Sequence, residues 1–160
     1  MIYVLYVQSG KEPDIVQELR RIGFAAYAPR QVRRYRVKGI VYNISEVMFA
    51  GYVFIDLPNG VHPEDYYKIV KVDGVGKFVS RTSCLSPTEE EYISKLYNGG
   101  DKIQIAHGII SSGILKIDND SWLKPFESHI VRYSKRQHRV TVELTFYGKP
   151  HRMICACDID

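Results

Sequence analysis

The chain lacks an apolar run of about 18 residues, the length that a membrane-spanning helix needs. Its first residues, Met1-Ile2-Tyr3-Val4, also lack the basic start that is typical of a signal peptide. We therefore expect a cytoplasmic protein with no membrane partner.

Cysteine is scarce, with three residues in a chain of 160. Cys155 and Cys157 are two positions apart, so in a strand both thiols lie on one face, where they cannot easily bond to each other. Neither a second cysteine pair nor a histidine cluster at zinc-ligand spacing accompanies them. We expect buried thiols, and neither a metal site nor a cofactor.

Catalytic sequence motifs are missing as well. The chain contains no glycine-rich phosphate loop and no nucleophile motif, and its five histidines are scattered. His129 and His138 could still face each other across a hairpin, as an RNA-processing nuclease would require. We expect a protein that is not an enzyme, and we keep such a nuclease as an alternative.

What is present describes an ordinary globular protein, with 45% hydrophobic and 25% charged residues. A length of 160 residues suits one average domain or two small ones. The net charge is +4. Both ends of the chain are positive and the middle is negative, so either end could bind an anionic partner.

The first half of the chain predicts a mixed fold. An apolar run is followed by a capping-box pattern, in which Ser9 caps a helix and Glu12 reaches back to it. The expected order is strand, helix, three strands, helix and strand, over residues 2–7, 9–23, 24–37, 41–47, 48–57, 62–72 and 78–79. This order predicts an α+β unit with an antiparallel sheet and helices packed on it.

A third helix is predicted from Ser86, because a serine N-cap, Pro87 at the first helical position and Glu89 three residues after the cap follow one another. From Gly113 the pattern is all-β, with candidate strands at residues 114–117, 128–133, 139–146 and 151–156. Short strands over this length predict a small barrel. We divide the chain into a domain at 1–97, a linker at 98–112 and a second domain at 113–160.

Two stretches carry a resemblance to a known family. The aromatic-rich segment Phe49-Ala-Gly-Tyr-Val-Phe-Ile55 is followed at a distance by Asp73-Gly-Val-Gly-Lys-Phe-Val79. With the helix that begins at Ser86, this arrangement resembles the N-terminal NGN domain of NusG-type transcription elongation factors. Residues 113–160 resemble the C-terminal KOW domain of the same family. The resemblance implies a monomeric, non-enzymatic transcription factor whose KOW domain is an SH3-like barrel.

The resemblance implies a surface that binds RNA polymerase. In this family an apolar depression on the NGN sheet binds the clamp helices of the β′ subunit, and four aromatic residues match it: Tyr6, Phe49, Tyr52 and Phe54. Aromatic side chains also supply the large apolar area that anchors protein–protein contacts. The alternative is that they belong to the hydrophobic core.

A basic arm follows the first helix. It carries five cations: Arg30, Arg33, Arg34, Arg36 and Lys38. Such groups neutralise phosphates whatever the base sequence. The resemblance implies that this arm lies near the upstream DNA, including the non-template strand. A solvated surface is the alternative.

A second basic segment lies in the KOW-like region. Its polar and charged residues are Arg132, Lys135, Arg136, Gln137, His138 and Arg139, and Lys124 precedes them. This segment resembles the LoaP subfamily of specialised antiterminators, whose KOW domain binds an RNA hairpin. Arginine and lysine would contact phosphates, while Gln137, His138 and Lys124 could contact base edges. A turn that only aids solubility is the alternative.

The expected function is therefore a processive antiterminator. It binds RNA polymerase, suppresses pausing and termination, and binds a leader RNA hairpin through its KOW domain. The alternative within the family is a general NusG-like elongation factor whose KOW domain binds Rho or a ribosomal protein.

Overall fold

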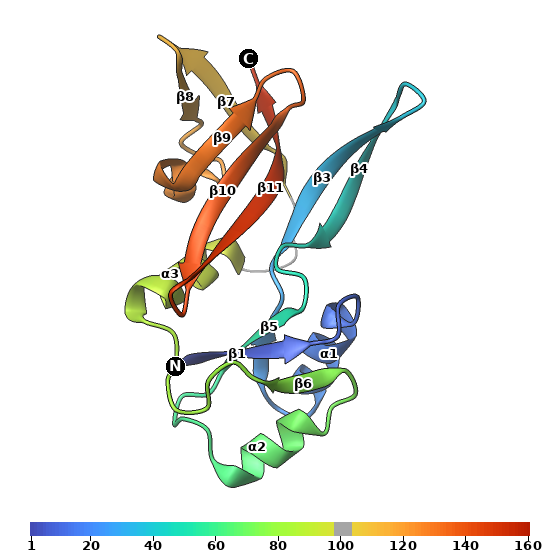
Figure 1. Cartoon of the computed structure of the whole chain (residues 1–160), viewed down its shortest axis with the longest axis vertical. Helices are drawn as coiled ribbons and strands as arrows, with labels where there is room; N and C mark the ends of the chain where they lie inside the picture. Colours follow the sequence, from blue (N-terminus) through green and yellow to red (C-terminus); the bar gives the residue numbers. More distant parts are fainter. Residues whose placement is uncertain (98–103) are drawn as a thin grey trace. The chain divides into compact units, whose positions relative to one another are not determined.

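The computed structural model describes residues 1–97 and 104–160. The chain forms two compact units (Figure 1). Unit 1 consists of Met1–Pro29 and Phe49–Tyr97, and unit 2 of Arg30–Met48 and Asn98–Asp160. Sheets and a few helices make the fold α+β, as the sequence predicts.

Unit 1 is built on a four-stranded antiparallel sheet with the order β2-β5-β1-β6. Its strands are β1 (Ile2–Val7), β2 (Ala25–Tyr27), β5 (Tyr52–Asp56) and β6 (Val75–Phe78). Its helices are α1 (Glu12–Arg21), α2 (Pro63–Val70) and α3 (Pro87–Tyr97). None of the helices in the described part of the chain is both long and apolar enough to cross a membrane.

One face of this sheet forms the core of unit 1. Alternate residues of β1 and β5, such as Leu5 and Val53, are fully buried on that face. Leu19 of α1 and Ile69 of α2 belong to the same cluster, so both helices cover one face of the sheet. The alternation places Tyr6, Tyr52 and Phe54 on the opposite face.

The helix starts differ in part from the prediction. At α3, Ser86 N donates to Glu89 Oε1 at 2.9 Å and Glu89 N donates to Ser86 Oγ at 3.2 Å, which confirms the capping box. At α1 the capping role of Ser9 is wrong, because Lys11 is the N-cap and its side chain forms no capping bond. Glu12 is buried and accepts hydrogen bonds from Gly10 N at 2.6 Å and Gly51 N at 3.1 Å.

The expected strand over residues 48–57 is shorter in the structure, where β5 begins only at Tyr52. A turn precedes it, in which Tyr52 N donates to Phe49 O at 3.2 Å. Gly51 occupies the left-handed region with φ of +85°, a conformation that interrupts an extended strand.

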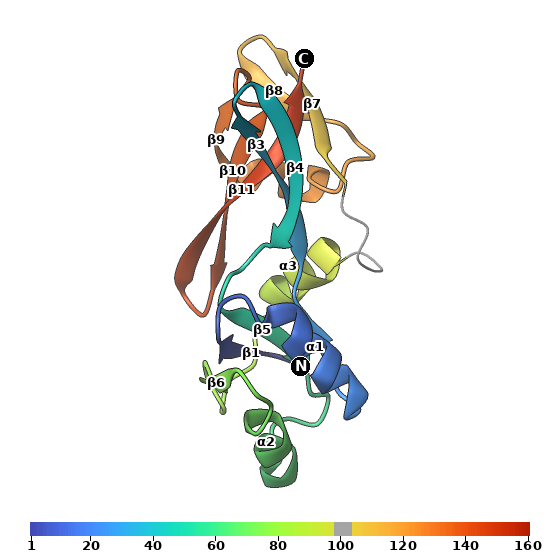
Figure 2. The same ribbon diagram turned by 90° about the vertical axis from the view of Figure 1, so that its right-hand side faces the viewer.

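Unit 2 contains a curled five-stranded sheet with the order β8-β7-β11-β10-β9 (Figure 2). Its strands are β7 (Ala106–Ser111), β8 (Ile114–Ile117), β9 (Ile130–Ser134), β10 (Arg139–Phe146) and β11 (Lys149–Ile159), and a 3-10 helix, η1, covers Lys124–His129. The β7–β11 pair is parallel and the other pairs are antiparallel. Strand β7 lies within the expected linker at 98–112, of which residues 98–103 are outside the described residues. The domain boundaries stay a prediction.

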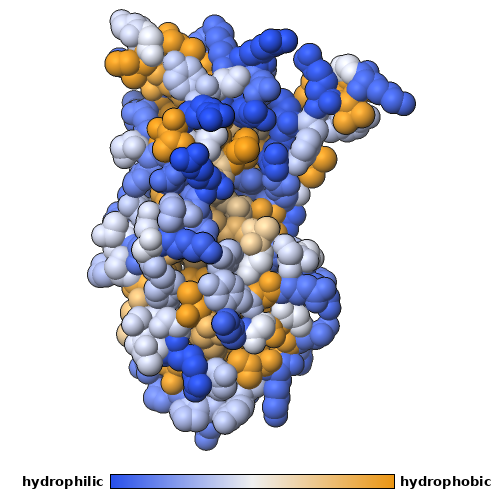
Figure 3. All heavy atoms as spheres, in the orientation of Figure 1, coloured by the Kyte–Doolittle hydropathy of each residue, from blue (hydrophilic) through white to orange (hydrophobic). Residues whose placement is uncertain are grey.

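The basic arm is a two-stranded hairpin of β3 (Arg30–Val37) and β4 (Ile40–Val47), and β3 lies against β11 of the curled sheet. Its tip is the two-residue turn Lys38-Gly39, with φ of 51° and 79°. Positive φ at both positions suits the right-handed twist of a tight hairpin. Apolar side chains are exposed among hydrophilic ones towards the tip, including Val37, Ile40 and Tyr42 (Figure 3).

Candidate nucleic-acid interface

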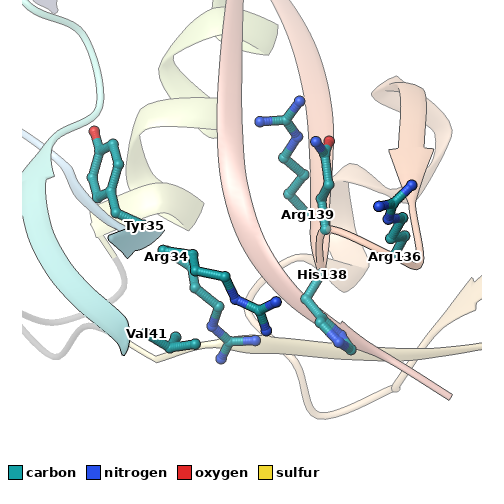
Figure 4. Close-up of a pocket in the computed structure, with 8 residues that line it drawn as sticks. Arg34, Tyr35, Val41, Arg136, His138 and Arg139 are labelled. Carbon is teal, nitrogen blue, oxygen red and sulfur yellow. The ribbon is translucent and has the colours of Figure 1, made fainter. Parts of the chain in front are cut away.

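A pocket lies within unit 2, between the β3–β4 hairpin and the turn that joins β9 to β10. Its volume is about 560 Å³. Its lining residues are Arg34, Tyr35, Arg36 and Val41 from the hairpin and Arg136, Gln137, His138 and Arg139 from the turn and the start of β10. Figure 4 shows the labelled hairpin residues on one side of this space and the labelled residues of the turn and of β10 on the other. We call it the hairpin–turn pocket.

Two adjacent residues of β11 hold both walls of the pocket. Asp158 Oδ1 accepts a hydrogen bond from Arg34 Nη1 on the hairpin at 2.7 Å. Cys157 N donates to the carbonyl oxygen of His138 in the turn at 2.9 Å. Both walls are therefore attached to the same strand, β11.

A further contact supports the base of the hairpin. The buried thiol of Cys155 on β11 donates to Gln31 Oε1 on β3 at 3.2 Å. Burial raises the pKa of this thiol to about 12, so it keeps the proton that it donates. Gln31 is itself buried, and its Nε2 donates to Glu46 Oε1 at 3.2 Å. The expectation of buried thiols is confirmed for Cys155 and Cys157, whereas Cys84 is half-buried.

The turn between β9 and β10 is held by local hydrogen bonds and exposes its side chains to solvent. Gln137 N donates to Ser134 Oγ at 3.2 Å, and His138 N donates to Lys135 O at 3.3 Å. His138 adopts a positive φ of 50°, which non-glycine residues rarely take. Lys135, Arg136, Gln137, His138 and Arg139 are all exposed.

The arginines of the pocket differ in how their charge is balanced. Arg34 is paired with Asp158 and its side chain is only 18% exposed. Among the residues that the structure describes, Arg36, Arg136 and Arg139 form no ion pair, and all three are exposed. These three cations are available to an anionic ligand.

Several predicted nucleic-acid residues have partners within the protein. Arg30 Nε donates to Ser45 Oγ at 2.9 Å, and Arg33 lies 3.3 Å from Glu46. Lys124 Nζ lies 3.0 Å from Glu127 Oε2, and the same oxygen accepts a 2.7 Å bond from Ile117 N. These two contacts lower the pKa of Glu127, the backbone bond more strongly. Lys38, Arg132 and Lys135 are exposed but do not line the pocket.

The four aromatic residues predicted to bind polymerase form two pairs in unit 1. The rings of Tyr6 and Tyr52 have centroids 5.4 Å apart, and those of Phe49 and Phe54 are 5.6 Å apart and edge-on. Phe49 and Phe54 are buried, whereas Tyr6 and Tyr52 are half-buried. Any binding role for the four residues stays a prediction.

The two histidines of the nuclease alternative lie at opposite ends of β9. His129 precedes Ile130, which pairs with Val142, whereas His138 follows the other end of the strand, where Ser134 pairs with Arg139. The two histidines therefore do not face each other across the hairpin, although the nuclease alternative suggests that they could. In the described ranges, no group of three or more histidine, cysteine or acidic residues could hold a metal ion.

Sequence reasoning missed part of the pocket. Tyr35 lies between arginines in the sequence, and aromatic residues among basic ones are a known signal for nucleic-acid binding. Val41 carries no such signal, because an apolar strand residue is expected in any sheet. The contacts of Asp158 and Cys157 depend on how the chain folds back on itself, so the sequence alone does not indicate them.

Comparisons with known proteins place the chain in a family. The model of the family NusG, described as transcription termination factor nusG, matches residues 2–97. Among solved structures, one on domain interaction in Thermotoga maritima NusG has 14% sequence identity and a TM-score of 0.49, covering 97% of this chain and 92% of that chain. Conformations B and A of the MjSpt4:Spt5 complex match at 13% and 14% identity, with TM-scores of 0.38 and 0.34 and 100% of both chains covered. A search of curated proteins found no match. The family model matches more than half of this chain, so the chain belongs to the NusG family of transcription factors.

Proposed function

We propose that the chain is a specialised NusG-family factor, of the LoaP type, that acts as a processive antiterminator. It binds RNA polymerase through unit 1 and a structured leader RNA through unit 2. By holding the polymerase in its elongating state it suppresses pausing and termination. It works as a monomer in the cytoplasm and is not an enzyme.

The observation that carries the RNA-binding part is the hairpin–turn pocket. Four of the residues expected to bind RNA, Arg136 to Arg139, lie together along it. Three exposed arginines without an ion pair among the described residues give it a positive charge. Arginine is suited to this role because its planar guanidinium can donate two parallel hydrogen bonds to a phosphate.

The polymerase-binding part rests on the family membership and on the aromatic pairs of unit 1. Tyr6 and Tyr52 are half-buried neighbours on the sheet face opposite α1 and α2. Such rings can contribute apolar area while their hydroxyl groups stay hydrated. We propose that these two residues, together with the Phe49–Phe54 pair, bind the clamp helices of the β′ subunit.

The proposal gives the hairpin a DNA-binding surface as well. Arg36 and Lys38 are exposed on its outer half, whereas Arg30, Arg33 and Arg34 have partners in the protein. We propose that Lys38, which lies outside the hairpin–turn pocket, contacts a phosphate of upstream DNA, including the non-template strand, while Arg36 lines the pocket. The other three arginines then mainly stabilise the hairpin.

The proposal is tested by single-round transcription in vitro with a bacterial RNA polymerase. The template carries the leader of the transcript that encodes the chain, followed by an intrinsic terminator. The full chain is compared with its Arg136→Ala/Arg139→Ala variant and with a template that lacks the leader. We expect terminator read-through that requires the leader and is lost in the variant.

Other outcomes distinguish the alternatives. Faster elongation that ignores both the leader and the variant would identify a general elongation factor, whose KOW domain then binds Rho or a ribosomal protein. No effect on elongation or termination would contradict the proposed function.

A further inference from the structure

We infer that the hairpin–turn pocket holds one unpaired nucleotide of an RNA loop. The phosphate would lie against the exposed arginines, and the base against Val41, Gln137 and His138. This inference rests on the RNA binding proposed above and deepens it. It makes the hairpin, which the sequence assigns to DNA, one wall of the RNA site.

The size of the pocket favours a discrete group over a smooth duplex surface. A volume of about 560 Å³ lies in the range of roughly 300–1,000 Å³ that small-molecule sites have. A nucleotide extruded from a loop is a ligand of that size. A regular RNA duplex keeps its bases stacked and shows proteins mainly phosphates and 2′-hydroxyl groups, so it would leave such a pocket unfilled.

The charges come from both walls. Arg36 extends the site on the hairpin side, and Arg136 and Arg139 line it on the turn side. The carboxylate of Asp158 is paired with Arg34. Its negative charge therefore neutralises Arg34 and leaves the charges of the three exposed arginines unbalanced. A phosphate between the walls would therefore meet cations from two directions.

The remaining side chains are suited to a base. Val41 pairs with Arg36 across the hairpin, so it lies on the same face as that arginine and offers an aliphatic surface to a base. The Tyr35 ring lies on the opposite face, where the guanidinium of Arg33 is 5.1 Å from its centroid. Gln137 and His138 offer both hydrogen-bond donors and acceptors on the turn side. An unpaired base exposes the edge that such groups read.

The pocket is also prepared for a ligand before binding. The hairpin is held to β11 by Arg34 and by Gln31, and the turn by the carbonyl oxygen of His138. A site whose walls are already fixed loses less conformational freedom on binding. A turn that only aids solubility would not need these contacts to the hairpin and to β11, so they favour a binding site.

The test measures binding of the full chain to a labelled stem-loop RNA with a randomised loop. The same stem without the loop, as a blunt duplex, and free guanosine monophosphate serve as comparison ligands. The hairpin wall is changed by Arg36→Ala and Val41→Ala, and the turn wall by Arg136→Ala. Two controls lie outside the pocket: Ile44→Ala trims an equally exposed apolar residue of β4, and Lys116→Ala removes an equal charge from β8. Fluorescence of Trp122, the single tryptophan, reports whether unit 2 of each variant is folded.

We expect the stem-loop to bind more tightly than the duplex. Val41→Ala should weaken stem-loop binding by about 5-fold, because it removes apolar surface that contacts the base. Arg36→Ala and Arg136→Ala should also weaken it, while Ile44→Ala and Lys116→Ala stay close to the unchanged chain. Because Arg36 and Val41 are both exposed, their variants change the hairpin wall without disturbing buried residues.

Three outcomes would overturn the inference in distinguishable ways. If Arg136→Ala weakens stem-loop binding and the hairpin variants do not, RNA binding stands but the two-walled site is wrong. Equal binding of stem-loop and duplex would exclude an unpaired nucleotide. If no RNA binds, the RNA-binding function fails with the inference, even where free guanosine monophosphate binds.

Discussion

Arg34 and Asp158 lie 124 residues apart in the sequence, yet Arg34 Nη1 donates to Asp158 Oδ1 over 2.7 Å. This contact joins the β3–β4 hairpin to the last strand of the curled sheet. Cys157, the neighbour of Asp158, holds the turn on the other side of the pocket. The shape of the proposed RNA site therefore depends on one short segment of β11.

A double-mutant cycle on Arg34→Ala and Asp158→Ala should reveal this contact. The Arg34 side chain is 18% exposed and that of Asp158 49%, so the pair is partly screened by water. We expect a coupling free energy of about 0.5–1 kcal/mol in urea unfolding followed by Trp122 fluorescence. The more exposed pair of Arg152 and Glu143 serves as the control and should couple less strongly. Strictly additive effects at Arg34 and Asp158 would mean that the two residues do not interact in solution.

The cysteines should differ in their reactivity. Burial raises the pKa of Cys155 to about 12 and that of Cys157 to about 11, so both remain thiols at neutral pH. The thiolate is the reactive form, and the two side chains are also shielded from reagents. We expect iodoacetamide to modify half-buried Cys84 first, and Cys155 and Cys157 only after unfolding, as read by mass spectrometry. Rapid native modification of Cys155 would contradict its bond to Gln31.

A pH dependence of stability should arise at His107 in β7. Its Nδ1 lies 2.5 Å from Asp118 Oδ2 and its Nε2 lies 2.9 Å from Asp160 Oδ2. The hydrogen bonds to Asp118 and Asp160 raise the pKa of His107 above its ordinary value. The stabilisation is complete below the unfolded pKa of about 6.5 and is lost as the pH rises through the folded pKa.

Thermal unfolding of unit 2 across this range, with an NMR titration of the imidazole, measures the effect. In the Asp160→Asn variant the pKa of His107 should fall and the loss of stability above neutral pH should shrink. An imidazole that titrates at its ordinary value in the unchanged chain would show that the two carboxylates do not hold it.

Tyr52 should be needed for polymerase binding. If it anchors the interface, Tyr52→Ala removes about 2 kcal/mol or more, which corresponds to a loss of affinity of about 30-fold. Binding of the full chain to a fragment carrying the β′ clamp helices is the measurement. Tyr67→Ala is the matched control, since Tyr67 is 60% exposed on α2. Equal affinity of both variants would remove Tyr52 from the proposed interface.

Much of the secondary structure could be predicted because its signals are local. The capping box at Ser86 and the Lys38-Gly39 turn each involve residues that are close in sequence. The start of α1 could not be predicted in the same way. Ser9 fits a capping pattern, but Glu12 accepts a bond from Gly51 N, 39 residues away, so tertiary structure decides its role.

The candidate site shows the same division. The basic residues of the arm and of the turn are visible as runs in the sequence. The NusG resemblance of the N-terminal part is visible too, and the family model confirms it over residues 2–97. The arm and the turn line one pocket because β3 packs against β11, and no local sequence pattern indicates this packing. For this reason the sequence assigns Arg34 to DNA, whereas in the structure it is bound to Asp158.

The most direct test is the salt dependence of leader RNA binding by the full chain. The logarithm of the association constant is followed against the logarithm of the salt concentration, for the unchanged chain, Lys116→Ala and Arg136→Ala/Arg139→Ala. If both arginines contact phosphates, the double variant should bind more weakly and its slope should be smaller by about 2, one for each lost contact. Lys116→Ala should keep the slope of the unchanged chain. An unchanged slope in the double variant would contradict the account, because the exposed arginines of the pocket would then not bind RNA.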